Sequence, residues 1–172
     1  MSESPIPETW QLFDQVHLPY RILLLAKLID RVTAQQLRAE EDLTLAEWRV
    51  LAHLALLEEA SSSRISAAAA ADRAEVSRAV ASLEKAGLID RRPDAANRKR
   101  LLLRLTEQGL ETHRRVRRRR VAYFEHLLED LGPEERERLD ASLLRIAARN
   151  AFRCEAGGTN ASPLLRSISH AW

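Results

Sequence analysis

The chain has 172 residues, 45% of them hydrophobic and 30% charged, which suits one domain or two small domains joined closely. No apolar run approaches the roughly 20 residues of a membrane span, and residues 1–8 lack the order of a signal peptide, so we expect neither a membrane partner nor secretion. The single cysteine, Cys154, cannot form an internal disulfide, which favours a cytoplasmic location.

The formal net charge of +2 is unevenly distributed along the chain. Between Leu88 and Arg120 there are twelve Lys or Arg and four Asp or Glu, an excess of +8 that leaves −6 for the remainder. Segregated positive charge predicts contact with a polyanion, although a solvated basic helix face is an equally open alternative.

Few glycines and prolines, with long stretches of Ala, Leu, Arg and Glu, predict a mainly helical fold. The pattern is helical from Trp10 to about Glu41, with Pro19 between a short entry turn and the long helix. Its apolar residues follow two adjoining stripes: Ile22, Leu25, Ile29 and Val32, with Leu24 and Leu28 beside them. Two apolar faces imply a partner helix.

The next two helices are short. Thr44 and Glu47 form a capping box that opens a helix through about Glu58. We expect its inward residues to be Leu45, Trp48, Leu51, Ala52 and Leu56. Residues 61–63 predict a break, and a run of five alanines predicts a helix from about Arg64 to Ala71.

A second capping box, Asp72 to Glu75, predicts a helix to Ala86, after which Gly87 takes the left-handed position that ends it. The inward residues of this helix are Val76, Val80 and Leu83. Residues 88–92 and 100–105 then read as two strands of a hairpin, joined by the turn-rich segment 93–97.

A helix follows from Thr106 to about Asp130, and Gly132 and Pro133 separate it from a last helix that ends near Cys154. We therefore expect a mainly α fold with a small β wing, a winged helix-turn-helix flanked by dimerisation helices. The predicted divisions are an arm and dimerisation helix (1–43), the winged helix-turn-helix (44–105), C-terminal dimerisation helices (106–154) and a mobile tail (155–172).

The order helix, short helix, tight turn, helix and basic hairpin is typical of a winged helix-turn-helix, whose second helix enters the major groove of DNA. The helix after Asp72 has the short polar outward face that this requires, and Arg78 can donate to a guanine edge or a phosphate. That face consists of Glu75, Ser77, Arg78, Ser82 and Lys85. Similar helix pairs also occur in packed bundles that bind no DNA.

A basic hairpin tip suits the minor groove, where the negative potential attracts arginine. Arg98, Lys99 and Arg100 lie at the tip, and Arg91 and Arg92 lie at the base. The alternative is a charged tip that keeps an edge strand soluble. The predicted DNA site comprises the five helix residues with Ser62, Ser63, Arg92, Arg98, Lys99 and Arg100.

Four segments carry a family resemblance: LTLAEWRVL at 43–51, EVSRAVASLEKAGLI at 75–89, RRPDAANRKR at 91–100 and LRLTEQG at 103–109. With them the chain, over roughly residues 18–150, resembles the MarR (multiple antibiotic resistance regulator) family of bacterial repressors. That family usually has Asp-Arg-Arg in the wing where this chain has Asn97-Arg98-Lys99, so the basic tip is kept and the acid is not.

The resemblance implies a homodimeric regulator, in most cases a repressor, that binds a pseudopalindromic operator and is released by a small effector. The effector is expected to be aromatic or anionic, such as an aromatic acid or its coenzyme A thioester, which the arginines at 114–120 could hold. These arginines could instead pair with acids of the partner chain. By analogy, the effector-binding residues are Trp10, His17, Tyr20, Arg21, Arg49, His53, Arg114 and Tyr123.

Other classes of function have weaker support. A redox sensor would act through Cys154, but the chain has no second cysteine to resolve it. The histidines lack metal-ligand spacing, and the sequence shows neither a nucleophile–base pair nor a metal cluster. We therefore expect that the protein binds no metal or cofactor and is not an enzyme. A helical interaction protein that does not bind DNA remains an alternative.

Overall fold

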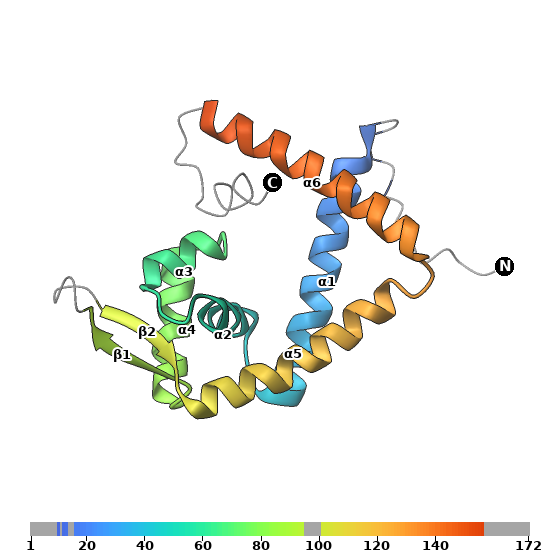
Figure 1. Cartoon of the computed structure of the whole chain (residues 1–172). Coiled ribbons are helices and arrows are strands. Elements are labelled where there is room, and N and C mark those ends of the chain that lie inside the picture. The colour runs from blue at the N-terminus through green and yellow to red at the C-terminus, as the bar shows by residue number, and fades with distance from the viewer. Residues whose placement is uncertain (1–9, 11, 14–15, 95–100, 157–172) are drawn as a thin grey trace. The chain divides into compact units, whose positions relative to one another are not determined.

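The computed structural model describes residues 10, 12–13, 16–94 and 101–156, with the backbone alone for 151–156. In this described part the chain forms six helices and one antiparallel pair of strands (Figure 1). It divides into two compact units, residues 1–45 and 46–172, and we describe each by itself. None of the described helices is both long and apolar enough to cross a membrane.

The first unit is built on the long helix α1 (Leu18–Glu41). Pro19 lies in its first turn, where the missing N–H is not needed. The helix ends at Asp42, which has a left-handed φ of 52°, and Leu43 donates back to the Leu37 carbonyl at 3.2 Å. Only Thr33 and Leu37 are buried within the helix, whereas Leu23, Leu25 and Leu28 are 42–49% exposed.

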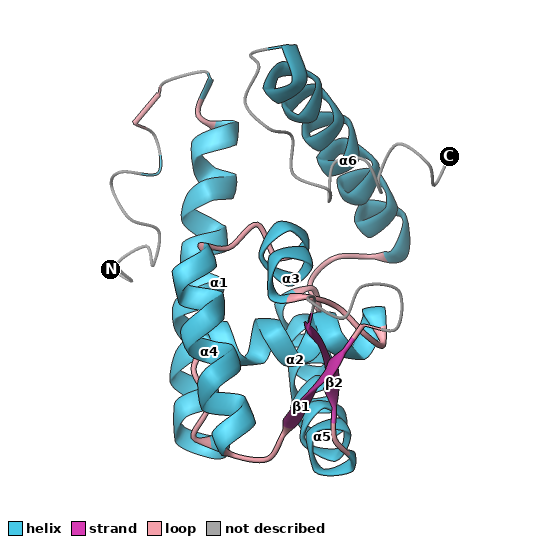
Figure 2. Ribbon diagram, turned by 90° about the vertical axis from the view of Figure 1, so that its left-hand side faces the viewer, coloured by secondary structure: helices cyan, strands magenta, loops and turns pink. Residues whose placement is uncertain are grey.

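The second unit begins with α2 (Leu45–Leu57), α3 (Ser62–Ala68) and α4 (Arg73–Lys85), followed by β1 (Ile89–Pro93) and β2 (Leu101–Leu105). Most of the buried apolar side chains belong to these elements, whose ribbons Figure 2 shows. Its most deeply buried side chains, each less than 2% exposed, include Val50, Leu51, Leu54, Ile65, Leu83 and Leu103.

The buried face of α2 differs from the one predicted. Leu56, expected inward, is 79% exposed, whereas Val50 and Leu54 are 0% and 1% exposed. The predicted set included Trp48, Ala52 and Leu56, which are spaced four residues apart, but the folded unit buries the stripe that contains Glu47, Val50, Leu51 and Leu54. The helix stops at Leu57 because Glu58 has a left-handed φ of 60°.

The prediction for α3 was wrong at both ends. Ser61 is not part of a break but the N-cap, and its hydroxyl accepts a hydrogen bond from the Arg64 N–H at 3.3 Å. At the other end, Ala70 has a left-handed φ of 48°, and Ala71 donates to the Ser66 carbonyl at 3.0 Å. This is a Schellman closure, so most of the alanine run forms the turn despite its helix propensity.

The hairpin strands lie within a residue of the predicted ones. They pair antiparallel in the register Ile89↔Leu105 through Pro93↔Leu101. Ala60 extends this sheet, because its N–H and C=O exchange hydrogen bonds of 3.1 and 2.9 Å with Leu103. The tip of the wing, residues 95–100, lies outside the described residues.

Two long helices complete the second unit, α5 (Glu107–Leu127) and α6 (Pro133–Ala156). The Thr106 hydroxyl caps α5 by accepting from the Gly109 N–H at 3.0 Å, and donates to the Gly87 carbonyl at 2.7 Å. One threonine thereby ties the end of α4 to the start of α5. The last helix extends two residues past Cys154, where it was expected to end.

Candidate nucleic-acid interface

Helix α4 has the structure of a recognition helix. The Asp72 carboxylate caps its N-terminus by accepting from the N–H groups of Ala74 and Glu75 at 2.9 and 3.0 Å. Val76, Ala79, Val80 and Leu83 are buried, and the opposite face is exposed. That exposed face includes Ser77, Arg78, Ser82 and Lys85, while Glu75 is half-buried.

The start of α3 supplies two further predicted residues. Ser63 is exposed, with its hydroxyl 3.0 Å from that of Ser61, whereas Ser62 is half-buried and its carbonyl accepts from the Ser66 hydroxyl. Ser63 is therefore the better placed of the two to meet a ligand at the surface.

The arginines of the wing strands are held in ion pairs. Arg104 donates from Nε and Nη2 to both carboxylate oxygens of Asp90, directly opposite in the register, at 2.8–3.1 Å. This pairing raises the pKa of Arg104 above its usual value, first through the hydrogen bond and then through the charge of Asp90. Arg91 Nε lies 2.9 Å from Glu84 Oε2 on α4, and Arg92 pairs with Glu59.

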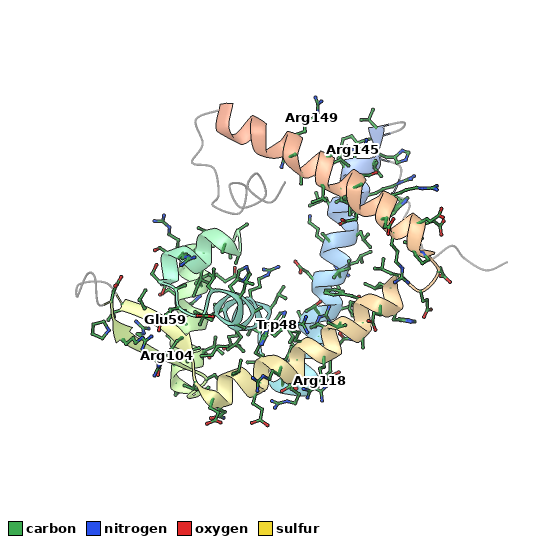
Figure 3. The ribbon with its side chains drawn as sticks, in the orientation of Figure 1. Trp48, Glu59, Arg104, Arg118, Arg145 and Arg149 are labelled. Carbon is green, nitrogen blue, oxygen red and sulfur yellow. The ribbon has the colours of Figure 1, made fainter. Side chains whose placement is uncertain are left out.

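These acidic partners were missed by the sequence reasoning. The Asp90–Arg104 pair follows from the hairpin register once the strands are correctly aligned. Figure 3 labels Arg104 on β2. Glu84 and Glu59 come from other elements, so only the tertiary structure brings them to the wing. The predicted contacts Arg98, Lys99 and Arg100 lie outside the described residues.

Two of the predicted effector residues of the first unit, Trp10 and Arg21, contact each other. Arg21 Nε donates to the Trp10 carbonyl at 3.0 Å, and its guanidinium lies 5.5 Å from the centroid of the Trp10 ring. Tyr20 packs edge-on against Phe13, with the ring centroids 5.1 Å apart. His17 occupies the N-cap position of α1 without a side-chain capping bond.

In the second unit the predicted effector residues lie on α2 and α5. His53 Nδ1 is 2.7 Å from the Arg49 carbonyl, and the Tyr123 ring lies 4.5 Å from the guanidinium of the buried Arg120. Arg114 is exposed. The sequence did not single out His113, whose ring stacks on Trp48 at 5.5 Å between centroids.

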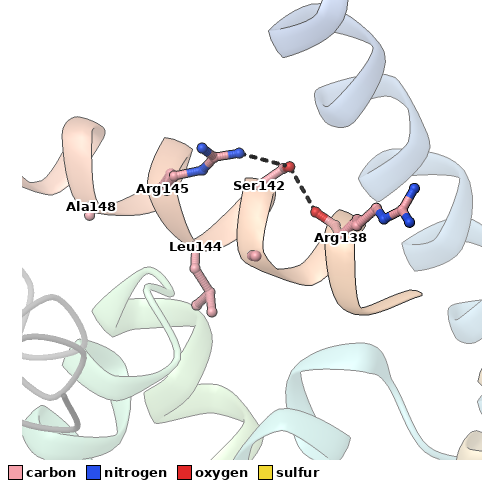
Figure 4. A pocket seen from close by; sticks show the side chains of 6 residues that line it. Arg138, Ser142, Leu144, Arg145 and Ala148 are labelled. Atoms are coloured by element: carbon pink, nitrogen blue, oxygen red, sulfur yellow. Dashed lines mark hydrogen bonds between the residues drawn. The ribbon is translucent and has the colours of Figure 1, made fainter. Parts of the chain in front are cut away.

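A hollow runs along one face of α6, and every side chain that lines it comes from that helix (Figure 4). Ser142 donates to the Arg138 carbonyl at 2.8 Å and accepts from Arg145 Nη2 at 3.3 Å, while Leu144 and Ala148 add apolar surface. It is an open helix face, not an enclosed cavity. Among the described residues, no group of three or more His, Cys, Asp or Glu is placed to hold a metal ion.

Comparison with known proteins identifies the fold. The arrangement of helices and the two-stranded wing is the winged helix fold of MarR-family transcriptional regulators. Residues 41–100 match the model of the MarR family, which confirms the predicted resemblance over this segment. No curated protein matches the chain.

Several solved structures are similar. AbsC, a MarR family transcriptional regulator from Streptomyces coelicolor, is 28% identical, with a TM-score of 0.68 over 79% of this chain and 94% of its own. A mutant MarR from E. coli complexed with operator DNA is 17% identical, with a TM-score of 0.68 over 82% and 99%. PcaV from Streptomyces coelicolor, in complex with its natural ligand, is 24% identical, with a TM-score of 0.61 over 84% and 96%.

Proposed function

We propose that the chain is a transcriptional regulator that reads duplex DNA through α4. The observation that carries this proposal is the exposed face of α4, which is short, polar and cationic beside a basic hairpin, on a helix anchored by its buried face. The similarity of the fold to a MarR protein in complex with operator DNA supports it.

In this proposal α4 lies in the major groove, which is wide enough for one helix. Arg78 is the residue most suited to donate two hydrogen bonds to a guanine, while Ser77 and Ser82 reach bases or phosphates next to it. Lys85 contacts the DNA backbone, and the wing tip at Arg98, Lys99 and Arg100 reaches the neighbouring minor groove.

The active form is a homodimer on a pseudopalindromic operator, with half-sites about 10 bp apart. Exposed apolar side chains on α1, α5 and α6 support this proposal, because large apolar patches on a soluble protein usually bind a partner. In the second unit they include Val121, Phe124, Leu127, Leu139, Leu143 and Ile146, each 38–46% exposed.

The protein acts as a repressor that a small anionic or aromatic effector releases. The ligand-bound state of PcaV and the abundance of arginine on α5 support this part of the proposal. A thermal-shift screen with aromatic carboxylates and acyl-coenzyme A esters tests it, because a ligand that binds only the folded state raises the melting temperature. No shift with either class would contradict it.

The experiment that tests DNA binding compares Arg78→Ala with Arg118→Ala, an exposed arginine on α5 that serves as a charge-matched control. The probe is a duplex selected by the protein from a random library, measured by fluorescence anisotropy at two salt concentrations. We expect Arg78→Ala to lose about 10-fold or more in affinity, as for a lost bidentate base contact, and Arg118→Ala to bind like the wild type.

Arg98→Ala, measured on the same probe, tests the wing-tip contact and should also weaken binding. The proposal fails if the wild type shows no preference for the selected duplex over unrelated DNA. It also fails if Arg78→Ala binds with wild-type affinity.

A further inference from the structure

The base of the wing carries two arginines whose partners come from outside the hairpin. Successive residues of a strand point to opposite faces, so Arg91 and Arg92 leave β1 in opposite directions. Arg91 shares its face with the buried Leu103 and reaches Glu84 on α4, and Arg92 pairs with Glu59 just before Ala60. One ion pair therefore lies on each side of the hairpin.

We propose that Glu84 and Glu59 are positioning residues that fix the wing relative to the recognition helix, and that Arg91 and Arg92 act as braces and not as DNA contacts. The expected effect on DNA affinity rests on the proposed DNA-binding function. The proposal that the ion pairs hold the wing in place does not. It assigns Arg92 a different role from the DNA contact that the sequence predicted.

The geometry favours a brace over a free cation. The Arg91 and Glu84 side chains are 36% and 40% exposed, and those of Arg92 and Glu59 are 48% and 32% exposed, so both pairs are partly shielded from water. Screening by salt weakens such pairs less than fully exposed ones. An arginine already paired with a carboxylate also gains less from a phosphate, since it must give up its present partner.

Backbone hydrogen bonds hold the second strand of the wing, β2. Leu103 of β2 exchanges two hydrogen bonds with Ala60, the residue next to Glu59. The wing is thus fastened through β2 by the backbone and through β1 by Glu59 and Glu84. Because Glu84 belongs to the last turn of α4, the direction of the wing follows the direction of the recognition helix.

The first test uses the free protein, without DNA. Hydrogen exchange of the amides in β1 and β2 is compared among the wild type, Glu84→Gln and Arg91→Ala, with Glu134→Gln as control. Glu134 is also an acid in an ion pair with an arginine, Arg138 at 3.1 Å, but on α6. We expect exchange in the strands to rise about threefold to tenfold in the two wing variants and to remain unchanged in the control.

Exchange in residues 73–83 of α4 is followed in the same samples, because a general loss of stability would raise it equally. A swapped pair, Glu84→Arg with Arg91→Glu, keeps the net charge and should return the strands to wild-type exchange. Unchanged strand exchange in Glu84→Gln, or an equal rise in strands and α4, would overturn the brace.

The second test measures DNA binding as a function of salt. A brace predicts that Arg91→Ala weakens binding about threefold to fivefold while the slope of log affinity against log salt stays constant, and that the swapped pair restores affinity. A phosphate contact predicts a slope smaller by about 0.9 and no rescue by the swap, which would overturn the proposal. If the wild type binds no duplex DNA, the proposed function fails. The hydrogen-exchange test would still show whether the ion pairs hold the wing in place.

Discussion

At the scale of single residues, His113 on α5 is a histidine whose surroundings lower its pKa. Its ring stacks on Trp48 of α2 at an interplanar angle of 14°, and its Nδ1 is buried without a hydrogen-bond partner in the described part of the chain. Burial lowers the pKa of His113, and the charges of Arg117 and Arg114 lower it further. Both effects favour the neutral form of the imidazole, which lies where α2 meets α5.

A depressed pKa makes the stability depend on pH in a definite direction. Below the ordinary value of 6.5 the unfolded chain takes up a proton that the folded chain resists, so this contribution to stability is present above 6.5 and is lost as the pH falls. His113→Phe keeps the stack and removes the titration. Its melting temperature should therefore drop less than that of the wild type between about pH 7.5 and about pH 5. An equal drop in melting temperature for the variant and the wild type would contradict this prediction.

At the scale of elements, α3 and α4 end in the same Schellman closure with different residues at the left-handed position. Ala70 takes it after α3 with a φ of 48°, and Gly87 takes it after α4 with a φ of 71°. A Cβ atom is costly in this region, whereas glycine adopts it freely. We therefore expect opposite changes in stability when the residues at the two left-handed positions are exchanged between alanine and glycine.

Ala70→Gly should stabilise the protein by about 0.5–1 kcal/mol, because relief of strain exceeds the added entropy of the unfolded chain. Gly87→Ala should destabilise it by about 1 kcal/mol, since the nearest atom to the added Cβ is 3.8 Å away and only the backbone strain counts. Urea denaturation monitored by circular dichroism measures both. A destabilised Ala70→Gly variant would show that the alanine methyl group packs usefully in the turn.

Gly109 illustrates a close approach between elements. A Cβ atom there would lie 1.9 Å from the backbone oxygen of Leu88, so the start of α5 and the start of the hairpin would have to separate. We expect Gly109→Ala to cost at least about 3 kcal/mol or to prevent folding. Gly132→Ala is the matched control, because its nearest neighbour is a movable Glu135 carboxylate oxygen at 3.4 Å. Similar stability of the two variants would refute the steric argument.

At the scale of the whole molecule, the exposed apolar residues of α6 make a prediction about assembly. Leu139, Leu143 and Ile146 recur at helical spacing and are 39–44% exposed. Replacing Leu143 and Ile146 by Glu should convert a dimer of about twice 19.5 kDa into a monomer, as measured by light scattering after gel filtration. Asn150→Glu, an exposed polar position on α6, should leave the mass unchanged. A double variant that remains dimeric would exclude this face from the interface.

Much of the winged helix could be predicted locally. The cap at Asp72, the start of a helix at Thr106, the inward residues of α4 and the glycine that ends it depend on hydrogen bonds and side-chain spacing within a few residues. The proposed DNA-reading face of α4 follows from the same periodicity. The effector residues and the division into 44–105 and 106–154 stay predictions.

The sequence by itself thus determined the order of the helices and strands and which face of α4 is left polar, because these depend on short-range interactions. The tertiary structure alone decided that Leu54 and not Leu56 enters the core, and that Glu84 meets Arg91. Each of these outcomes depends on which surfaces of distant segments meet, and spacing along a single chain does not encode that information.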